Sequence, residues 1–373
     1  MNKDLLNIVI TGGPCGGKTT ALDELTKLLR SYGFYVLIVP ETATEMKNNG
    51  ILPYGPNGLS KKDFQEILLD IQLSKEKYFR EAAKRCPSKK VAILYDRGVL
   101  DNRAYIDDAT FQEFLKARNI SEAEILSSYD IVFHLVTAAN GKEEYYTLEN
   151  NTARSETPSE ARERDVLTME TWRNHPNLRI VGNDTLFDVK INKVKNYIRE
   201  YLGEEKVIKK ERYLVKLNDF SQLFNNQDAV KEEIESFVVY NFESYNDMYS
   251  KSTINGSNYY TCTTNVIEME GITKSVCRPI TKQEYEFAES KNRGLLLKKT
   301  RYNFIFNNER YRYDMYNLYG EFFNILERDV AFTSIHELPP FVHVIEDITN
   351  NPDYNDDSLC TDYNINYVYN KRK

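Results

Sequence analysis

The pattern of apolar positions divides the chain into two parts with different periods. Up to residue 203, short unbroken apolar runs alternate with stretches in which leucines recur at helical spacing, as Leu22, Leu25 and Leu29 do. Unbroken runs are typical of strands that are buried on both faces of a parallel sheet. They comprise residues 8–10, 35–39, 91–95, 131–136 and 178–181. We therefore expect a three-layer α/β domain over residues 1–203, followed by a short linker at 204–207.

Beyond the linker the pattern changes to period two. In residues 297–316, charged residues such as Lys299 alternate with neutral ones such as Tyr302, and the alternation is interrupted at Asn307. Such alternation, broken by turn residues, is typical of an antiparallel hairpin with one charged face and one aromatic face. We therefore expect an α+β domain with an antiparallel sheet over residues 208–373.

The stretch TGGPCGGKTT, residues 11–20, has the spacing of a phosphate-binding loop. It follows an apolar run and precedes an amphipathic helix, and this context favours a nucleotide site over a glycine-rich turn that matches by chance. We expect the Lys18 ammonium to reach the outer phosphates and the Thr19 hydroxyl to bind Mg²⁺. The residues expected to contact the nucleotide are Gly12, Gly13, Pro14, Cys15, Gly16, Gly17, Lys18, Thr19 and Thr20.

Two acidic residues and an arginine come directly after predicted strands. Glu41 follows the second strand in LIVPET, and Asp96 and Arg97 end the third in AILYDRG. Ligands of open parallel sheets bind beyond the carboxyl ends of the strands, so these side chains should face the phosphates. We expect Glu41 to act as the base, Asp96 to bind Mg²⁺ together with Thr19, and Arg97 to contact phosphate. The alternative is that both acids only cap the helices that follow.

Three arginines lie in the segment TARSETPSEARERD. Arg154 precedes a predicted helix, and Arg162 and Arg164 lie in its first two turns. Such a segment suits a lid that places arginines over a transferring phosphoryl group and excludes water. The alternative is a charged helix face exposed to solvent.

The motifs of the first part resemble a known group of proteins. GGPCGGKTT, PET, YDRG and ARSETPSEARERD are similar to the NadR and TRPL-translocation-defect type of AAA-like P-loop domain, which is related to nucleoside and ribosylnicotinamide kinases. The resemblance implies binding of a nucleoside triphosphate, with Glu41 and Asp96 as the acidic pair and the three arginines in the lid. The chain has no N-K-x-D motif that would read guanine, which favours ATP, but the resemblance keeps GTP open.

The second part is similar to the CYTH, or triphosphate-tunnel, domain. The resemblance rests on KKERYLVKL, RPITKQEYE, LKKTRYNF, RYRYDMY, ILERDV and IEDITNNPDYNDDSLC, and it implies an antiparallel barrel with a charged interior. In such an interior, basic side chains grip a polyphosphate and acidic side chains hold a metal ion. The residues expected to line it are Glu211, Arg278, Lys299, Arg301, Arg312, Asp314, Glu327 and Asp329. Without the resemblance, a charged strand face would be expected to face solvent.

Several residues depart from the tunnel hydrolases. Where their first strand carries E-x-E-x-K, this chain has Lys209, Glu211 and Tyr213, and Arg312 replaces a further acid. The loss of two metal-binding acids predicts a domain that binds an anion but hydrolyses triphosphate poorly or not at all. The order of the two domains also resembles the translocation-defect proteins of animals, which are associated with GTP and phosphoinositides.

Composition limits the partners and the compartment. The net charge of −7 argues against broad attraction to nucleic acids or anionic membranes. The five cysteines form no C-x-x-C pair, and the sequence has no cationic leader and no run of about 20 apolar residues. We therefore expect a soluble cytoplasmic protein.

The sequence is compatible with three functions. The first is a Mg²⁺-dependent ATPase or small-molecule kinase, and the second is a nucleotide-controlled module that binds a phosphoinositide or a protein partner with little turnover. The third, a tunnel triphosphatase, is disfavoured by the residues at positions 209, 213 and 312.

Overall fold

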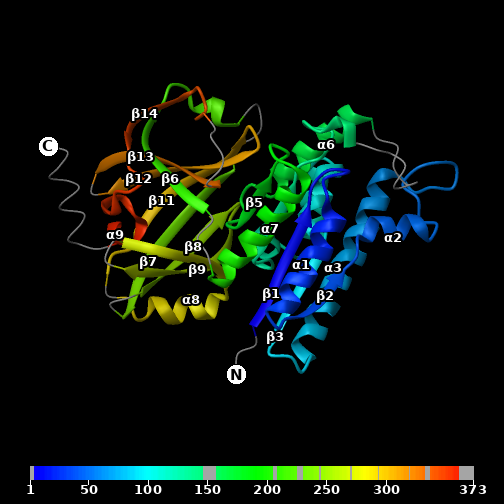
Figure 1. Cartoon of the computed structure of the whole chain (residues 1–373), viewed down its shortest axis with the longest axis horizontal. Coiled ribbons are helices and arrows are strands. Elements are labelled where there is room, and N and C mark those ends of the chain that lie inside the picture. The colour runs from blue at the N-terminus through cyan, green and yellow to red at the C-terminus, as the bar shows by residue number, and fades with distance from the viewer. Residues whose placement is uncertain are drawn as a thin grey trace. The chain divides into compact units, whose positions relative to one another are not determined.

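The chain folds into two compact units. The computed structural model describes residues 4–145, 157–204, 208–224, 230–242, 245–268, 271–292, 294–318, 320–331 and 337–360 (Figure 1). The units comprise Met1–Asn196 and Tyr197–Lys373, and each is considered by itself below. The domain boundary expected at residue 203 stays a prediction.

The first unit contains a parallel sheet, which confirms the expected fold class. Its strands lie in the order β2-β3-β1-β4-β5, and every pairing is parallel. Consecutive residues of β3 and β4 are buried, and because alternate residues point to opposite faces, both faces of the sheet are covered. The strands are β1 (Asp4–Thr11), β2 (Tyr35–Val39), β3 (Lys90–Asp96), β4 (Ile131–Leu135) and β5 (Leu178–Val181).

Several helices of this unit begin at a residue whose side chain caps the first turn. The spacings Ser121-x-x-Glu124 and Thr157-x-x-Glu160 in the sequence predict capping boxes, and both are present. Pro158 occupies the first position of its helix. The helical elements are α1 (Lys18–Ser31), α2 (Thr42–Asn48), α3 (Lys61–Arg85), η1 (Val99–Tyr105), α4 (Asp108–Ala117), α5 (Glu122–Ser127), η2 (Glu143–Tyr145), α6 (Pro158–Thr171) and α7 (Phe187–Leu202).

A buried aspartate fixes the end of α6 and the start of η1 against the central strand. Asp101 accepts hydrogen bonds from the Trp172 indole at 2.8 Å, the Thr11 hydroxyl at 2.7 Å and the Gly98 amide at 2.9 Å. Trp172 is fully buried. These contacts set the position of α6 relative to the loop that follows Thr11.

The second unit contains an antiparallel sheet, as expected. Among the described residues it has nine strands in the order β10-β9-β8-β7-β11-β12-β13-β6-β14, and neighbouring strands pair in antiparallel fashion. The strands are β6 (Ile208–Leu217), β7 (Lys231–Phe242), β8 (Tyr245–Ile254), β9 (Ser257–Glu268), β10 (Gly271–Ile280), β11 (Leu297–Phe306), β12 (Glu309–Leu318), β13 (Glu321–Ala331) and β14 (Val342–Asp347). The predicted hairpin is β11–β12, and both Asn307 and Asn308 adopt the positive φ that a tight hairpin turn requires.

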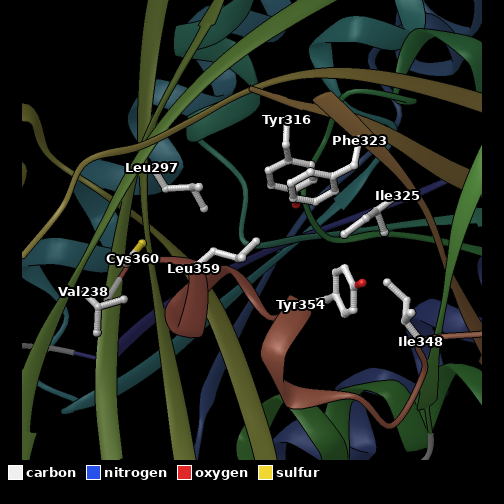
Figure 2. Packing of buried hydrophobic residues seen from close by; sticks show 9 residues of the cluster. All are labelled: Val238, Leu297, Tyr316, Phe323, Ile325, Ile348, Tyr354, Leu359 and Cys360. Carbon is white, nitrogen blue, oxygen red and sulfur yellow. The ribbon is translucent and has the colours of Figure 1, made fainter. Parts of the chain in front are cut away.

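The C-terminal segment packs on the face of the sheet that carries the charged residues. Short helical elements in the described part of this unit are η3 (Phe220–Phe224), α8 (Lys282–Glu289), η4 (Pro352–Tyr354) and α9 (Asp356–Leu359). Tyr354 and Leu359 pack with Tyr316, Ile325 and Val238 in one buried cluster (Figure 2). The charged face is therefore covered at this end and does not simply face solvent. Within the described part of the chain, no helix is both long and apolar enough to span a membrane.

Candidate functional site

The loop between β1 and α1 is wound tightly against the end of β4. Gly12, Cys15 and Gly17 have φ values of 128°, 57° and 95°. A Cβ atom on Gly12 would lie 2.0 Å from the carbonyl oxygen of Leu135, and one on Gly16 would lie 2.5 Å from the same atom. Only glycine fits at these positions, so the predicted loop is a folded element and not a loosely matching turn.

The charged end of Lys18 lies over this loop. Lys18 is the first residue of α1, and its ammonium donates hydrogen bonds to the carbonyl oxygens of Gly12 at 3.1 Å and Gly13 at 2.8 Å. The first turn of α1 also presents its partial positive charge here, and Thr19 and Thr20 are exposed in that turn. The predicted phosphate-binding residues are therefore contiguous and oriented around one N-terminal helix end.

The acids expected beside the loop lie at the correct edge of the sheet. Glu41 follows β2 and precedes α2, and Asp96 ends β3. Arg97 donates from Nε to Glu41 Oε1 at 3.1 Å, and the Thr44 hydroxyl donates to Glu41 Oε2 at 2.6 Å. Burial acts to raise the pKa of Glu41, but the Arg97 charge, the Thr44 hydrogen bond and the Lys18 charge outweigh it and lower the pKa to about 2.

Asp96 has the opposite electrostatic character. Burial and the charge of Glu41 raise its pKa above the ordinary aspartate value, against the lowering effect of Lys18 and Arg97. Its Oδ1 atom is buried with no hydrogen-bond partner among the described residues. A buried carboxylate oxygen in this state is suited to a cation or a ligand proton.

The described residues contain no group of three or more His, Cys, Asp or Glu side chains that could hold a metal ion. A Mg²⁺ ion at this edge would instead be shared between protein and nucleotide, as Mg²⁺ commonly is. The Asp96 carboxylate and the exposed Thr19 hydroxyl are oxygen donors of the type that Mg²⁺ prefers, so the residues present fit the ion.

Arg97 is held in a strained backbone conformation. Its φ is 76°, a value that costs a non-glycine residue about 1–3 kcal/mol and that often marks a functional site. Its Nη1 atom is buried without a hydrogen-bond partner in the described structure. One edge of the guanidinium thus pairs with Glu41 and the other is available to an anion.

The predicted lid arginines are bound to neighbouring segments. Arg162 donates to the carbonyl oxygen of Ala139 at 2.9 Å, while Arg164 donates to the carbonyl oxygen of Ala104 and lies 4.5 Å from the Tyr105 ring centre. None of these contacts involves the phosphate loop. Arg154 lies outside the described residues, and the lid stays a prediction.

The residue that joins α6 to the phosphate loop is Asp165, which the sequence reasoning missed. Its carboxylate accepts the Gly13 amide at 2.5 Å and lies 3.0 Å from His134 Nε2. In the sequence Asp165 is the last residue of the charged stretch ARERD, in which a role was predicted only for the arginines. No local pattern distinguishes it from a solvated acid.

The charged face of the second sheet is neutralised by its own residues. Lys299 Nζ lies 2.8 Å from Asp314 Oδ2, and Arg301 binds both oxygens of Asp314 at 2.6 and 2.7 Å. Arg312 contacts Glu327 at 2.8 Å and Asp329 at 2.8 and 2.9 Å. Burial acts to raise the pKa of Asp314, but Arg301 and Lys299 hold it well below the usual range.

Two residues expected on this face lie on the other one. Glu211 pairs with Arg328 at 2.9 Å, and both are offset by one residue from the Arg212–Glu327 pair that belongs to the charged face. Arg278 is exposed and pairs in register with Cys262. Both residues lie on the face opposite to the charged one. Because a shift of one residue reverses the direction of a strand side chain, neither Glu211 nor Arg278 joins the charged cluster.

A carboxylate of the C-terminal segment occupies the basic end of this face. Asp356 lies 2.5 Å from Lys299 Nζ and accepts from the Tyr316 hydroxyl at 2.7 Å. Arg212 donates to the carbonyl oxygen of Tyr354 at 2.6 Å and to Asn355 Oδ1 at 2.8 Å. The chain itself supplies the acceptors that a bound anion would offer to these groups.

Replacing Lys299 by Met should lower the free energy of unfolding of the second unit by about 3 kcal/mol, because Asp314 and Asp356 then lack a buried counter-charge. The adjacent Lys298 provides a matched control, since its side chain is 65% exposed and pairs with Glu235 at the surface. Lys298→Met should cost less than about 1 kcal/mol. Denaturant unfolding of both variants measures the difference, and equal losses would contradict the buried network.

Replacing Arg97 by Met should raise the pKa of Glu41 from its value of about 2, because burial remains while the largest lowering contribution is removed. In the wild type a lowered pKa stabilises the fold above pH 4.5, and this stabilisation is lost as the pH falls toward 2. Carboxyl ¹³C NMR titration measures the shift. Arg103→Met, which removes contacts to Asp108 and Glu122, should leave Glu41 unchanged.

Comparison with known proteins assigns the first unit. Residues 7–188 match the family model described as an AAA domain, and no curated protein matches the chain. Similar solved structures include the thymidylate kinase from Ehrlichia chaffeensis, with 17% identity, a TM-score of 0.37 and coverage of 53% of this chain and 99% of that one. The inorganic triphosphatase NE1496 has 13% identity, a TM-score of 0.29 and coverage of 42% of this chain and 97% of that one. The narrower resemblance to NadR-type proteins stays a prediction, and the family match together with the loop geometry shows that the first unit contains an AAA-like P-loop domain.

Proposed function

We propose that the first unit is a Mg²⁺-dependent P-loop phosphotransferase that moves the terminal phosphoryl group of ATP or GTP to a small nucleoside-type acceptor. One observation carries the proposal. At the edge of the sheet where Lys18 covers the loop, Asp96 Oδ1 and Arg97 Nη1 are buried and have no hydrogen-bond partner in the part of the chain that the structure describes. A site built for a ligand holds polar groups that only the ligand satisfies.

Different residues of the site bind the phosphates and the Mg²⁺ ion. The loop amides and Lys18 bind the β- and γ-phosphates, and Thr19 and Asp96 hold Mg²⁺, which neutralises charge on the phosphate oxygens. Arg97 contacts the transferring group with its unpaired edge. Arg162 and Arg164, with Arg154, form the lid.

Arg97 also controls the proposed base. Glu41 is a weak proton acceptor while Arg97 is paired with it, because that charge lowers its pKa to about 2. If Arg97 turns to the phosphoryl group, Glu41 loses this charge and becomes more basic at the moment when the acceptor hydroxyl must lose its proton. Asp96, whose pKa is raised, is the alternative acceptor of that proton.

The second unit has a separate proposed role, the binding of a polyphosphate or phosphoinositide. Its basic residues Lys299, Arg301 and Arg312 support this role, but an anion must compete with Asp314, Glu327, Asp329 and Asp356 for them. The acids that a tunnel triphosphatase would use for metal are ion-paired here, which supports binding without hydrolysis. A nucleotide-controlled binding module is therefore the second candidate function.

Phosphorus NMR of Mg-ATP and Mg-GTP, with and without pooled nucleosides and ribosylnicotinamide, tests the phosphotransferase. We expect acceptor-dependent loss of the γ-phosphate signal with wild type and its abolition in Lys18→Ala. Lys27→Ala is the matched control, because Lys27 is a 72% exposed lysine on the same helix. A γ-phosphate signal that broadens but persists with every acceptor would favour the binding module.

Isothermal titration with inorganic triphosphate tests the second unit in a Lys18→Ala background, which weakens phosphate binding by the loop of the first unit. Asp356→Asn should tighten triphosphate binding about tenfold, because the Asp356 carboxylate then no longer competes with the anion for Lys299. Asp353→Asn, two residues beyond Asn351, is the control and should change little. No gain in Asp356→Asn would count against anion binding at this face.

A further inference from the structure

A single buried carboxylate joins the arginine-bearing helix to the phosphate loop. Asp165 lies in the second turn of α6 and is 2% exposed. Its Oδ1 accepts the amide of Gly13 at 2.5 Å, and its Oδ2 accepts the amide of Thr137 at 3.2 Å. His134, at the end of β4, contacts Oδ1 through Nε2 at 3.0 Å.

The contact leaves the loop little freedom. A Cβ atom on Gly13 would lie 2.7 Å from Asp165 Oδ1 and 2.8 Å from the Cβ of Thr137. From the other side, the Thr137 hydroxyl donates to the carbonyl oxygen of Pro14 at 2.5 Å. Gly13 and Pro14 are thus held through both an amide and a carbonyl group.

The choice of a charged residue at this buried point needs an explanation. Burial acts to raise the pKa of Asp165, but His134 and the amides of Gly13 and Thr137 outweigh it and lower the pKa. Three N–H groups directed at one carboxylate compensate for its desolvation, and a neutral side chain could not accept all three. The carboxylate therefore organises backbone around it in a way that apolar packing could not.

We propose that Asp165 is a positioning residue that fixes the phosphate loop in its binding conformation and couples it to α6. Arg162 and Arg164 lie within one turn of Asp165 on the same helix, so the position of both arginines is tied to that of the loop. The proposal rests on the proposed function, since it assigns Asp165 to the assembly of that site. Asp165 contacts the loop backbone and not the transferred group.

Hydrogen exchange without nucleotide tests the coupling itself. In Asp165→Asn, the side-chain amide cannot accept the Thr137 N–H, and exchange in peptides covering residues 11–17 and 134–140 should become at least tenfold faster. The matched control is Glu76→Gln, because Glu76 is an equally buried acid of this unit that binds Tyr129 and Arg80 away from the loop. Its exchange should change around residue 76 and not in the loop.

Nucleotide binding tests the consequence of the coupling. At a temperature where both variants are folded, Asp165→Asn should weaken Mg-ATP and inorganic triphosphate binding at least tenfold, and Glu76→Gln should leave both within twofold of wild type. Equal effects in the two variants, or unchanged loop exchange in Asp165→Asn, would overturn the proposal, since either would assign Asp165 to general stability.

A milder variant covers the case in which Asp165→Asn does not fold. Thr137→Val leaves the Asp165 contacts in place and removes the two bonds of the Thr137 hydroxyl, the one donated to the Pro14 carbonyl and a longer one accepted from the Ala139 amide at 3.3 Å. It should weaken nucleotide binding about threefold to tenfold with faster exchange in residues 11–17. Unchanged binding and exchange in this variant would overturn the coupling. If instead wild type binds neither nucleotide nor triphosphate while loop exchange responds as expected, the proposed function fails and the coupling stands.

Discussion

The buried charges of this protein must be compensated, and the two units do this in different ways. In the second unit each basic group named on the charged face contacts an acid from the same sheet or from the C-terminal segment, as Lys299 does with Asp314 and Asp356. In the first unit, Asp96 Oδ1 and Arg97 Nη1 are buried beside the phosphate loop with no hydrogen-bond partner among the described residues. Because a buried polar atom without a hydrogen bond is costly, a ligand that supplies partners at this edge would be stabilised there.

This difference decides what each unit can offer an anion. The phosphate loop presents backbone amides, a helix N-terminus and the Lys18 ammonium, which donates hydrogen bonds to the carbonyl oxygens of Gly12 and Gly13. The second sheet presents more basic side chains, but Asp356 already supplies a carboxylate to Lys299 and Tyr316. The number of basic residues in a sequence is therefore a poor measure of anion affinity unless the acids that pair with them are known.

The parts of the structure that the sequence predicts are those set by local rules. The phosphate loop, the capping boxes at Ser121 and Thr157, and the β11–β12 hairpin depend on spacing within a few residues, and all three are present. Glu211 and Arg278 were misplaced because strand register decides their direction, and register is fixed by pairing with distant strands. Asp165 and Asp356 were missed for the same reason, since their partners lie far away in the chain.

The pairing of Arg97 with Glu41 shows how the compensation of a buried charge affects the basicity of a carboxylate. Arg97 has a strained backbone, its Nε pairs with Glu41, and its Nη1 has no hydrogen-bond partner among the residues that the structure describes. An anion at Nη1 competes for the charge that keeps the pKa of Glu41 near 2, so phosphate binding and carboxylate basicity are linked through one side chain. In the phosphotransferase proposed above, this link would keep Glu41 a weak proton acceptor until a phosphoryl group reaches Arg97, and it would disfavour proton transfer in the absence of substrate.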